Sequence, residues 1–288
     1  MRPDEQVVLY NLFKQLHYTG KPLVLPNAWD PMSAKLLQQC GFPALGTTSA
    51  GIAASLGRPD GERVGVEEMI AAVGRIAAAV DIPVTADLEA GYSCTPETIG
   101  ELARKAAAAG VAGLNIEDGA GGAALGLLDA GEQARRIHAI QAAAADVGLP
   151  LFINARIDTY WHRIGEEKER LSATLDRAEI YRHAGADGIF VPGVSDLETI
   201  TILAGQLALP LNVLASPELP DLAALAAAGV ARVSTGSGLY RAAMTGLRDM
   251  GMTLFRQGDY ASILQRAMRY DEMQLLLEGR RGQGEQKS

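Results

Sequence analysis

Three acidic residues follow short apolar segments at positions where a carboxylate could do chemistry. Asp87 and Glu89 are two residues apart, so in extended chain their side chains point the same way. Glu117 ends the next predicted strand. Carboxylates gathered in one place repel one another unless a cation lies between them. Because no His or Cys is nearby, an all-oxygen set favours Mg²⁺ or Mn²⁺ over zinc.

A second group of residues could bind an anionic substrate. Arg156 ends the strand predicted after the one that carries Glu117, and a guanidinium can hold an anion at two points. The hydroxyls and backbone N–H groups of Thr48-Ser49-Ala50 could hold a carboxylate where a loop or helix begins. Asn212 lies in a later predicted strand, and Trp29 follows the first one. We expect all of these residues to contact the substrate.

Each candidate also has a purely structural interpretation. An acidic residue after a strand is often the N-cap of the next helix, and this applies above all to Asp118. Asp60 lies in a loop rich in Gly and Pro, where its position alone favours a turn. Tyr92 and Trp29 could simply line the mouth of a site. A purely structural role is least convincing for the four charged residues that fall on three successive predicted strands. These are Asp87, Glu89, Glu117 and Arg156.

The elements that must position these residues alternate along the chain. Short β-rich segments alternate with longer helical ones, which predicts a parallel sheet. Eight such units favour an α/β fold of the closed (β/α)8 TIM-barrel type, and no G-x-G-x-x-G follows the first strand. Such barrels keep their active sites at the carboxyl ends of the strands. The predicted strands are 22–26, 44–48, 83–87, 113–117, 151–155, 188–191, 211–214 and 232–234. The predicted helices are 31–40, 66–80, 96–109, 132–147, 167–184, 196–207 and 219–228.

Length and composition set further limits. A chain of 288 residues suits one barrel, so we expect a single domain over 1–288, with a long helical segment at 239–277 and a disordered tail at 279–288. The net charge is −8 and no basic stripe for nucleic acid is present. No apolar segment reaches the roughly 20 residues that span a bilayer. The four histidines lack metal-ligand spacing, and the two cysteines, without an export signal, predict a reduced, cytoplasmic protein.

Over about residues 20 to 250 the chain resembles the isocitrate lyase and phosphoenolpyruvate mutase superfamily. Together the matching segments are specific, although none would suffice alone. They are NAWDPMSA at 27–34, TSAGIAASLGRPDG at 48–61, ADLEAGY at 86–92, GLNIED at 113–118 and NARID at 154–158.

The resemblance implies roles for the metal-site candidates and an assembly. In that family the residue matching Asp87 holds Mg²⁺ directly or through water. Those matching Glu89 and Glu117 hold metal-bound waters. The family commonly exchanges barrel helix eight between subunits in a dimer of dimers, and the segment 239–277 is compatible with such a homo-oligomer.

The resemblance also implies how a substrate would be held. Arg156 matches an arginine that contacts the substrate's carboxylate or phosphoryl group. The turn at 47–50 matches one that binds an α-keto carboxylate through backbone N–H groups. Asp60 matches an aspartate that lies near the substrate in several members. We therefore expect Asp60, Glu117 and Arg156 to be catalytic.

The chain departs from the lyase members in the loop after its fourth predicted strand. Isocitrate and methylisocitrate lyases carry Lys-Lys-Cys-Gly-His there, whereas residues 119–126 read GAGGAALG. The mutase and phosphonopyruvate hydrolase carry polar residues in this loop, which are also missing. Glu89 stands where many members have the second Asp of Asp-x-Asp. Isocitrate cleavage by the usual route is therefore not expected.

Three functions remain open on these grounds. The shared chemistry is a keto-acid enolate stabilised by Mg²⁺ acting as a Lewis acid. Decarboxylation of an oxaloacetate-like 2-oxo acid needs only this, so C–C cleavage of a small carboxylate substrate is the favoured reading. P–C chemistry on phosphonopyruvate or phosphoenolpyruvate is the second possibility. A non-catalytic keto-acid binding protein is the third, because the loop has lost its acid and base groups.

Overall fold

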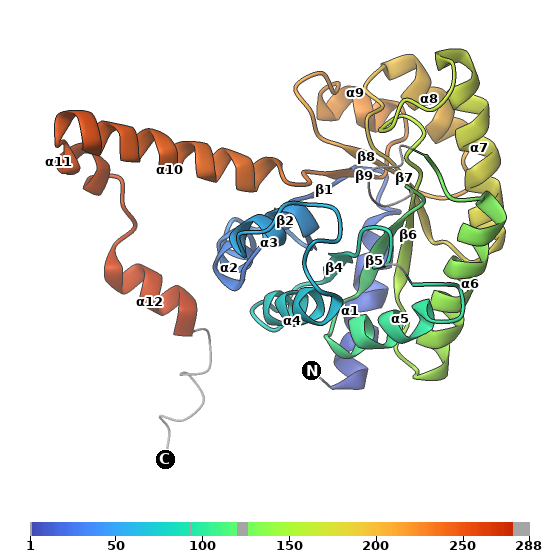
Figure 1. Cartoon of the computed structure of the whole chain (residues 1–288), viewed down its shortest axis with the longest axis horizontal. Helices are drawn as coiled ribbons and strands as arrows, with labels where there is room; N and C mark the ends of the chain where they lie inside the picture. Colours follow the sequence, from blue (N-terminus) through green and yellow to red (C-terminus); the bar gives the residue numbers. More distant parts are fainter. Residues whose placement is uncertain (1, 93, 120–125, 279–288) are drawn as a thin grey trace.

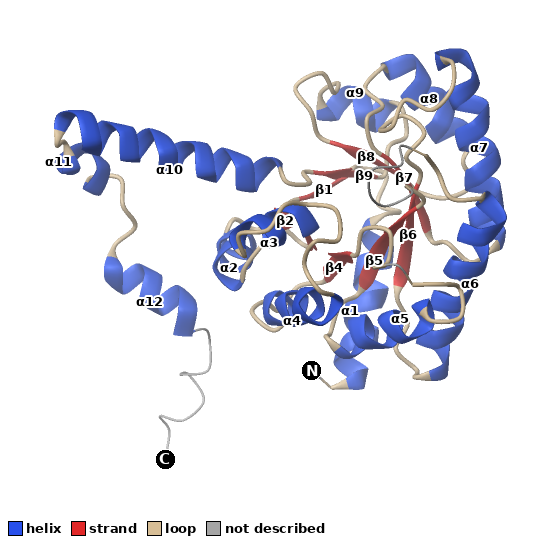
Figure 2. Ribbon diagram, viewed as in Figure 1, coloured by secondary structure: helices blue, strands red, loops and turns tan. Residues whose placement is uncertain are grey.

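The computed structural model describes residues 2–92, 94–119 and 126–278. Nine parallel strands form one sheet in the order β1-β9-β8-β7-β6-β5-β4-β3-β2, and it curls into a barrel surrounded by helices (Figures 1 and 2). The predicted (β/α)8 barrel is thereby confirmed. The strands are β1 (Leu23–Leu25), β2 (Asn27–Ala28), β3 (Leu45–Thr47), β4 (Val84–Asp87), β5 (Gly113–Glu117), β6 (Phe152–Arg156), β7 (Gly188–Val191), β8 (Leu211–Leu214) and β9 (Arg232–Ser234).

The ninth strand arises because the first predicted strand is divided at Pro26. The part before Pro26 pairs with β9, and the part after it pairs with β3. Pro26 has no N–H to donate, but its carbonyl accepts a hydrogen bond from Gly46 N at 2.9 Å. The chain therefore passes from one neighbouring strand to the other at this proline, which closes the barrel.

The seven predicted helices around the barrel are present, with shifted ends, and two further ones were not expected. Of these two, α1 (Pro3–Leu16) packs against the amino ends of the strands, where Phe13 meets Phe152 at 5.4 Å between ring centroids. The other, α3 (Ser49–Ser55), follows β3 directly. The remaining helices are α2 (Pro31–Gln39), α4 (Val66–Ala77), α5 (Ile99–Ala108), α6 (Ala130–Asp146), α7 (Glu167–His183), α8 (Leu197–Gln206) and α9 (Leu222–Ala227).

The alternation of residues along the strands separates the core from the site. On β5, Leu114 and Ile116 pack into the main apolar core, which the sheet shares with the surrounding helices. Asn115 and Glu117 alternate with them and line a cavity at the carboxyl end of the barrel. The same two-residue period therefore places apolar groups outside the barrel and polar groups inside it.

The C-terminal segment forms an arm that extends away from the barrel (Figure 1). It consists of α10 (Gly238–Gln257), α11 (Tyr260–Leu264) and α12 (Tyr270–Glu278), none of which has a buried residue. The helical segment expected over 239–277 thus consists of three helices, and the first ends at Gly258, whose φ of 64° lies in the left-handed region. The predicted disordered tail at 279–288 lies outside the described residues.

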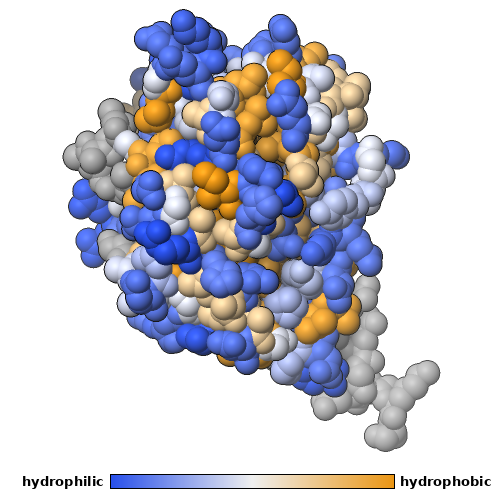
Figure 3. All heavy atoms as spheres, turned by 90° about the vertical axis from the view of Figure 1, so that its right-hand side faces the viewer, coloured by the Kyte–Doolittle hydropathy of each residue, from blue (hydrophilic) through white to orange (hydrophobic). Residues whose placement is uncertain are grey.

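The outer surfaces differ in character. The side that carries α6 and α7 mixes hydrophilic side chains with smaller hydrophobic areas (Figure 3). The arm, in contrast, exposes many large apolar side chains, including Phe255, which is 87% exposed. Within the described part of the chain, no helix has both the length and the apolar character needed to cross a membrane.

Candidate active site

A cavity of about 200 Å³ lies at the carboxyl ends of the strands, where the sequence placed the chemistry. Eight of the ten residues proposed as site residues line it, and Trp29 and Asn212 do not. The eight are Thr48, Ser49, Ala50, Asp60, Asp87, Glu89, Glu117 and Arg156.

Asp87 is held in place by the hydroxyl-rich segment that begins α3. Ser49 Oγ donates to Asp87 Oδ2 at 2.7 Å, and Thr47 Oγ1 accepts from Asp87 N at 3.0 Å. Thr48 caps α3, since its Oγ1 accepts from Gly51 N at 3.2 Å. The polar residues of this segment therefore orient a carboxylate of the protein in addition to lining the cavity.

Glu89 reaches the cavity in a way that strand alternation does not describe. β4 ends at Asp87, and Glu89 has a φ of 49°, so it lies in a turn and not in extended chain. Its carboxylate accepts hydrogen bonds from Glu62 N at 2.7 Å and from the Tyr92 hydroxyl at 3.2 Å. The argument that Asp87 and Glu89 point the same way in extended chain was therefore wrong, although both line the same cavity.

Burial and neighbouring charge raise the pKa values of these carboxyls. Burial, together with the charges of Asp87 and Asp60, raises the pKa of Glu89 to about 7. Burial also raises the pKa of Asp60, with a further contribution from Asp87. The pKa of Glu117 is raised by burial despite the attraction of Arg156. Each carboxyl is thus destabilised in its charged form, which is what a bound cation would relieve.

Arg156 links two carboxylates, one at the end of the adjacent strand and one just after its own strand. Its Nη1 lies 2.6 Å from Glu117 Oε2, across the β5–β6 pair in which these residues are register partners. Its Nε donates to Asp158 Oδ1 at 2.7 Å. The guanidinium also lies 5.8 Å from the ring centroids of Trp161 and Phe190, both of which line the cavity.

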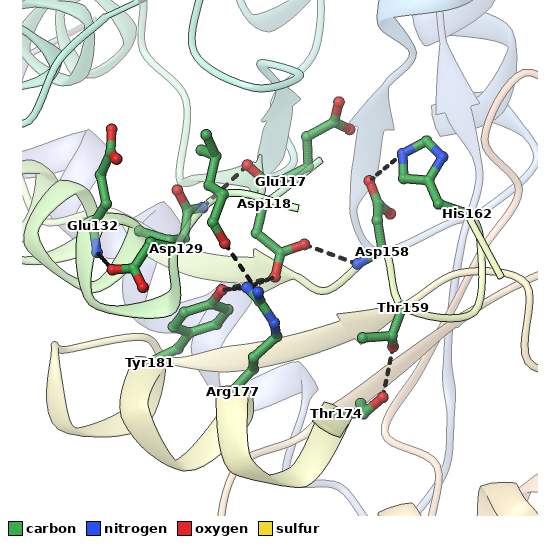
Figure 4. Close-up of polar contacts among 12 residues, drawn as sticks. Glu117, Asp118, Asp129, Glu132, Asp158, Thr159, His162, Thr174, Arg177 and Tyr181 are labelled. Atoms are coloured by element: carbon green, nitrogen blue, oxygen red, sulfur yellow. Dashed lines mark hydrogen bonds and ion pairs between the residues drawn. The ribbon is translucent and has the colours of Figure 1, made fainter. Parts of the chain in front are cut away.

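Asp118 is a structural residue, but it is not the helix N-cap that the sequence suggested. α6 is capped by Asp129, whose side chain accepts from Glu132 N. Asp118 is fully buried, and it accepts hydrogen bonds from Arg177 Nη1 at 3.0 Å and the Tyr181 hydroxyl at 2.7 Å (Figure 4). It therefore anchors α7 to the end of β5, beside the site.

The two predicted residues outside the cavity have other contacts. Trp29 packs edge-on against Tyr240 of α10, with 5.3 Å between the ring centroids. Asn212 is buried inside the barrel, where its Oδ1 accepts from Ser234 Oγ at 3.0 Å. Asn212 belongs to a polar layer that also contains Arg232, which is fully buried and has its pKa lowered to about 9 by burial. Substrate contact by Trp29 or Asn212 therefore has no support in this geometry.

Several cavity residues were not singled out from the sequence. Asn27, Asn115 and Ser234 lie on strands and could have been found from strand alternation. Trp161 and His162 come from the loop after β6, for which the sequence pattern offers no signal.

The chemistry of the donor set fits a divalent cation. Four carboxylates, those of Asp60, Asp87, Glu89 and Glu117, line the cavity, and their oxygens suit Mg²⁺ or Mn²⁺. Among residues 2–92, 94–119 and 126–278, no three His, Cys, Asp or Glu side chains are grouped closely enough to hold one ion.

Comparison with known proteins identifies the family to which the chain is similar. The model of the phosphoenolpyruvate phosphomutase family matches residues 13–255. The chain is 40% identical over 265 residues to the uncharacterized protein Rv1998c of Mycobacterium tuberculosis (strain ATCC 25618 / H37Rv), covering 90% of this chain and 97% of that one. It is 31% identical over 253 residues to the oxaloacetate decarboxylase of Pseudomonas fluorescens (strain SBW25), covering 84% and 83%.

A solved structure agrees with these matches. A provisionally named phosphonomutase from Burkholderia cenocepacia J2315 is 40% identical and superposes with a TM-score of 0.80, covering 85% of this chain and 99% of that chain. The resemblance read from the sequence is thereby confirmed, and the chain belongs to the phosphoenolpyruvate phosphomutase family of enzymes.

Proposed function

We propose that the protein is a Mg²⁺- or Mn²⁺-dependent lyase that cleaves a C–C bond in a small 2-oxo acid. Decarboxylation of an oxaloacetate-like acid is the simplest form of this reaction. The observation that carries the proposal is one cavity lined by four carboxylates and the guanidinium of Arg156. Carboxylates can hold a divalent cation, and the arginine can hold an anionic substrate beside it.

The residues of the cavity divide this work between them. Asp87 would hold the cation, oriented by Ser49, while Glu89 and Glu117 would hold its water ligands. Arg156 would bind the substrate carboxylate. When bound, the cation supplies Lewis-acid stabilisation of the negative charge that develops on the keto oxygen.

The cavity suits a small substrate. A volume of about 200 Å³ is sufficient for a small acid such as a four-carbon 2-oxo acid. Asp60 and Trp161 line it, and Phe190 adds an apolar side chain to its wall. Its size and the positive charge of Arg156 are compatible with a compact anionic substrate, such as a 2-oxo acid with a second carboxylate.

Decarboxylation is favoured over other C–C cleavage by the loop after β5. Residues 119–126 contain only Gly, Ala and one Leu, so no side chain in this loop can donate or accept a proton. Loss of CO₂ from a 2-oxo acid needs no base to begin. The relative from Pseudomonas fluorescens that is named an oxaloacetate decarboxylase supports the same choice.

P–C bond chemistry is the second candidate. The matching family is described as phosphoenolpyruvate phosphomutase, and an arginine such as Arg156 can bind a phosphoryl group as well as a carboxylate. The purified protein should therefore be assayed with Mg²⁺ against oxaloacetate and phosphonopyruvate in parallel. Release of CO₂ from the first alone supports the decarboxylase; phosphate or phosphoenolpyruvate from the second alone supports P–C chemistry.

We also propose that the C-terminal arm binds a second copy of this chain, in a homo-oligomer such as a dimer of dimers. α10 exposes Met244, Leu247, Leu254 and Phe255, and a free chain would leave this apolar surface in water. Helices that are apolar yet unburied in one chain are typical of segments exchanged between subunits.

A further inference from the structure

His162 is the one histidine in the wall of the cavity, within the part of the chain that the structure describes. It lies on the loop after β6, and its backbone N–H donates to the Asp158 carbonyl at 2.9 Å. Its side chain is 22% exposed, so a ligand in the cavity can reach it. The roles proposed above do not use this residue.

The carboxylate of Asp158 lies beside the imidazole of His162. Its Oδ1 accepts a hydrogen bond from Arg156 Nε at 2.7 Å, and its Oδ2 lies 3.7 Å from His162 Nε2 (Figure 4). Oδ2 is buried and accepts no hydrogen bond from any residue that the structure describes. An imidazole that becomes protonated next to this oxygen gains a countercharge, which is how carboxylates orient catalytic histidines.

Gly119 provides the space in which this pair fits. A Cβ at position 119 would lie 2.8 Å from Asp158 Oδ2, which is too short, and 3.1 Å from His162 Nε2, which would require the imidazole to shift. Gly119 pairs with Leu127 through an isolated antiparallel bridge, at the base of the Gly- and Ala-rich loop. The histidine thus lies against Gly119, the first residue of a Gly- and Ala-rich sequence, 119–126, that contains no side-chain proton donor.

We propose that His162 is the general acid that protonates C3 of the enolate left after decarboxylation, an inference that rests on the proposed function. In the forward direction the C3–C4 bond breaks, C4 leaves as CO₂, and the electron pair remains on the enolate. C3 then takes the proton from a ring nitrogen of protonated His162, which forms the methyl group of pyruvate. The neutral imidazole regains its proton from solvent, so each turnover consumes one proton.

The reverse of this proton transfer gives a test that does not depend on C–C cleavage. By microscopic reversibility, His162 should also remove a proton from the methyl group of pyruvate. With pyruvate and Mg²⁺ in D₂O, the parent protein should therefore exchange the methyl protons of pyruvate for deuterium. The loss of the methyl signal in proton NMR measures this exchange. His162→Gln should slow this exchange by about 100-fold or more, in line with the usual contribution of a general acid–base group.

The same variants separate this inference from the proposed function. Release of CO₂ from oxaloacetate in a single turnover should persist in His162→Gln, because bond cleavage precedes the proton transfer. Added imidazole should partly restore exchange in His162→Ala. The matched control is His183→Gln, a histidine on the outer surface of α7 that should leave both reactions unchanged.

Two results would overturn the assignment of His162. One is parent-level exchange in His162→Gln, with or without a raised KM for oxaloacetate. The other is a parent protein that releases CO₂ but does not exchange the methyl protons of pyruvate. A parent protein that exchanges these protons but releases no CO₂ would contradict the proposed decarboxylation and leave the role of His162 supported. If the parent protein does neither, both proposals are wrong.

Discussion

Arg156 Nη1 lies 2.6 Å from Glu117 Oε2, so the guanidinium proposed to bind substrate is already paired with a carboxylate at the end of the adjacent strand. Its Nε is engaged by Asp158. Within the described residues, Nη2 donates no hydrogen bond, which leaves it for the substrate. One side chain therefore both orders the carboxylates and presents a positive charge to the cavity.

The first prediction follows from this geometry. Arg156→Lys keeps the positive charge, but an ammonium group cannot reproduce the two contacts with Glu117 and Asp158 and still present a third donor to the substrate. A hydrogen bond to a charged group contributes about 1.5–3 kcal/mol, so we expect the KM for the 2-oxo acid to rise roughly 10-fold to 100-fold. Steady-state kinetics measure this change.

Arg177→Lys is the matched control for that prediction. Arg177 is also partly buried and also bridges an aspartate, Asp118, but it does not line the cavity. The Arg177→Lys substitution should lower the thermal stability of the protein and leave the KM for the 2-oxo acid unchanged. An unchanged KM in Arg156→Lys would show that Arg156 has a purely structural role.

The second prediction concerns the cation. Asp87→Ala should abolish Mg²⁺ binding measured by calorimetry, while circular dichroism shows an intact fold. Glu89→Ala and Glu117→Ala should weaken Mg²⁺ binding by about 10–100-fold, because ligands that act through water typically contribute that much. Asp118→Asn, at a buried aspartate outside the cavity, should cost stability and leave Mg²⁺ affinity unchanged. Full Mg²⁺ affinity in Asp87→Ala would contradict the assignment.

The third prediction is a pH dependence of stability. The pKa of Glu89 is raised from 4.5 to about 7 in the folded protein, so the folded state keeps a proton that the unfolded chain loses. The resulting stabilisation is complete below pH 4.5 and is lost as the pH rises through 7. In the absence of metal, Tm should therefore fall between pH 5.5 and 8.

Mg²⁺ should reverse this trend, because it binds the charged carboxylates. The increase in Tm caused by Mg²⁺ should be larger at pH 8 than at pH 5.5. Glu89→Gln has no proton to lose and should reduce the pH dependence of Tm in the metal-free protein. A Mg²⁺ effect that is equal at both pH values would argue against these carboxyls as the binding site.

Much of this site could be predicted because its chemistry is carried by strands. Asp87, Glu117 and Arg156 end consecutive parallel strands, so their carboxyl-end location follows from the strand pattern alone. Other features depend on contacts between distant segments. Asp118 meets Arg177 and Tyr181 across about sixty residues of sequence, and no local pattern could separate this role from an N-cap.

Backbone conformation limited the sequence analysis in a different way. Glu62, Glu89 and Tyr92 all have positive φ values although none of them is glycine. Their mutual hydrogen bonds stabilise these conformations, with Tyr92 N donating to Glu62 Oε1. Residue types alone do not indicate such turns, so the sequence does not predict that the hydroxyl of Tyr92 contacts Glu89.

The fourth prediction concerns the C-terminal arm. If the arm contacts a second chain, Phe255→Asp should shift the protein to a smaller oligomer in light scattering coupled to gel filtration. Val147→Asp, which changes an exposed apolar residue at the end of α6, is the control and should leave the mass unchanged. A parent protein that is monomeric at all concentrations would contradict the proposed self-association.

The most direct test of the proposed function is the release of CO₂ from oxaloacetate by purified protein, corrected for the rate with Mg²⁺ alone. We predict release that requires Mg²⁺, stops on chelation, returns when Mg²⁺ is added back, and is lost in Asp87→Ala. Isocitrate and methylisocitrate should not be cleaved under the same conditions. A rate no higher than with Mg²⁺ alone, an undiminished rate in Asp87→Ala, or robust isocitrate cleavage would contradict the account.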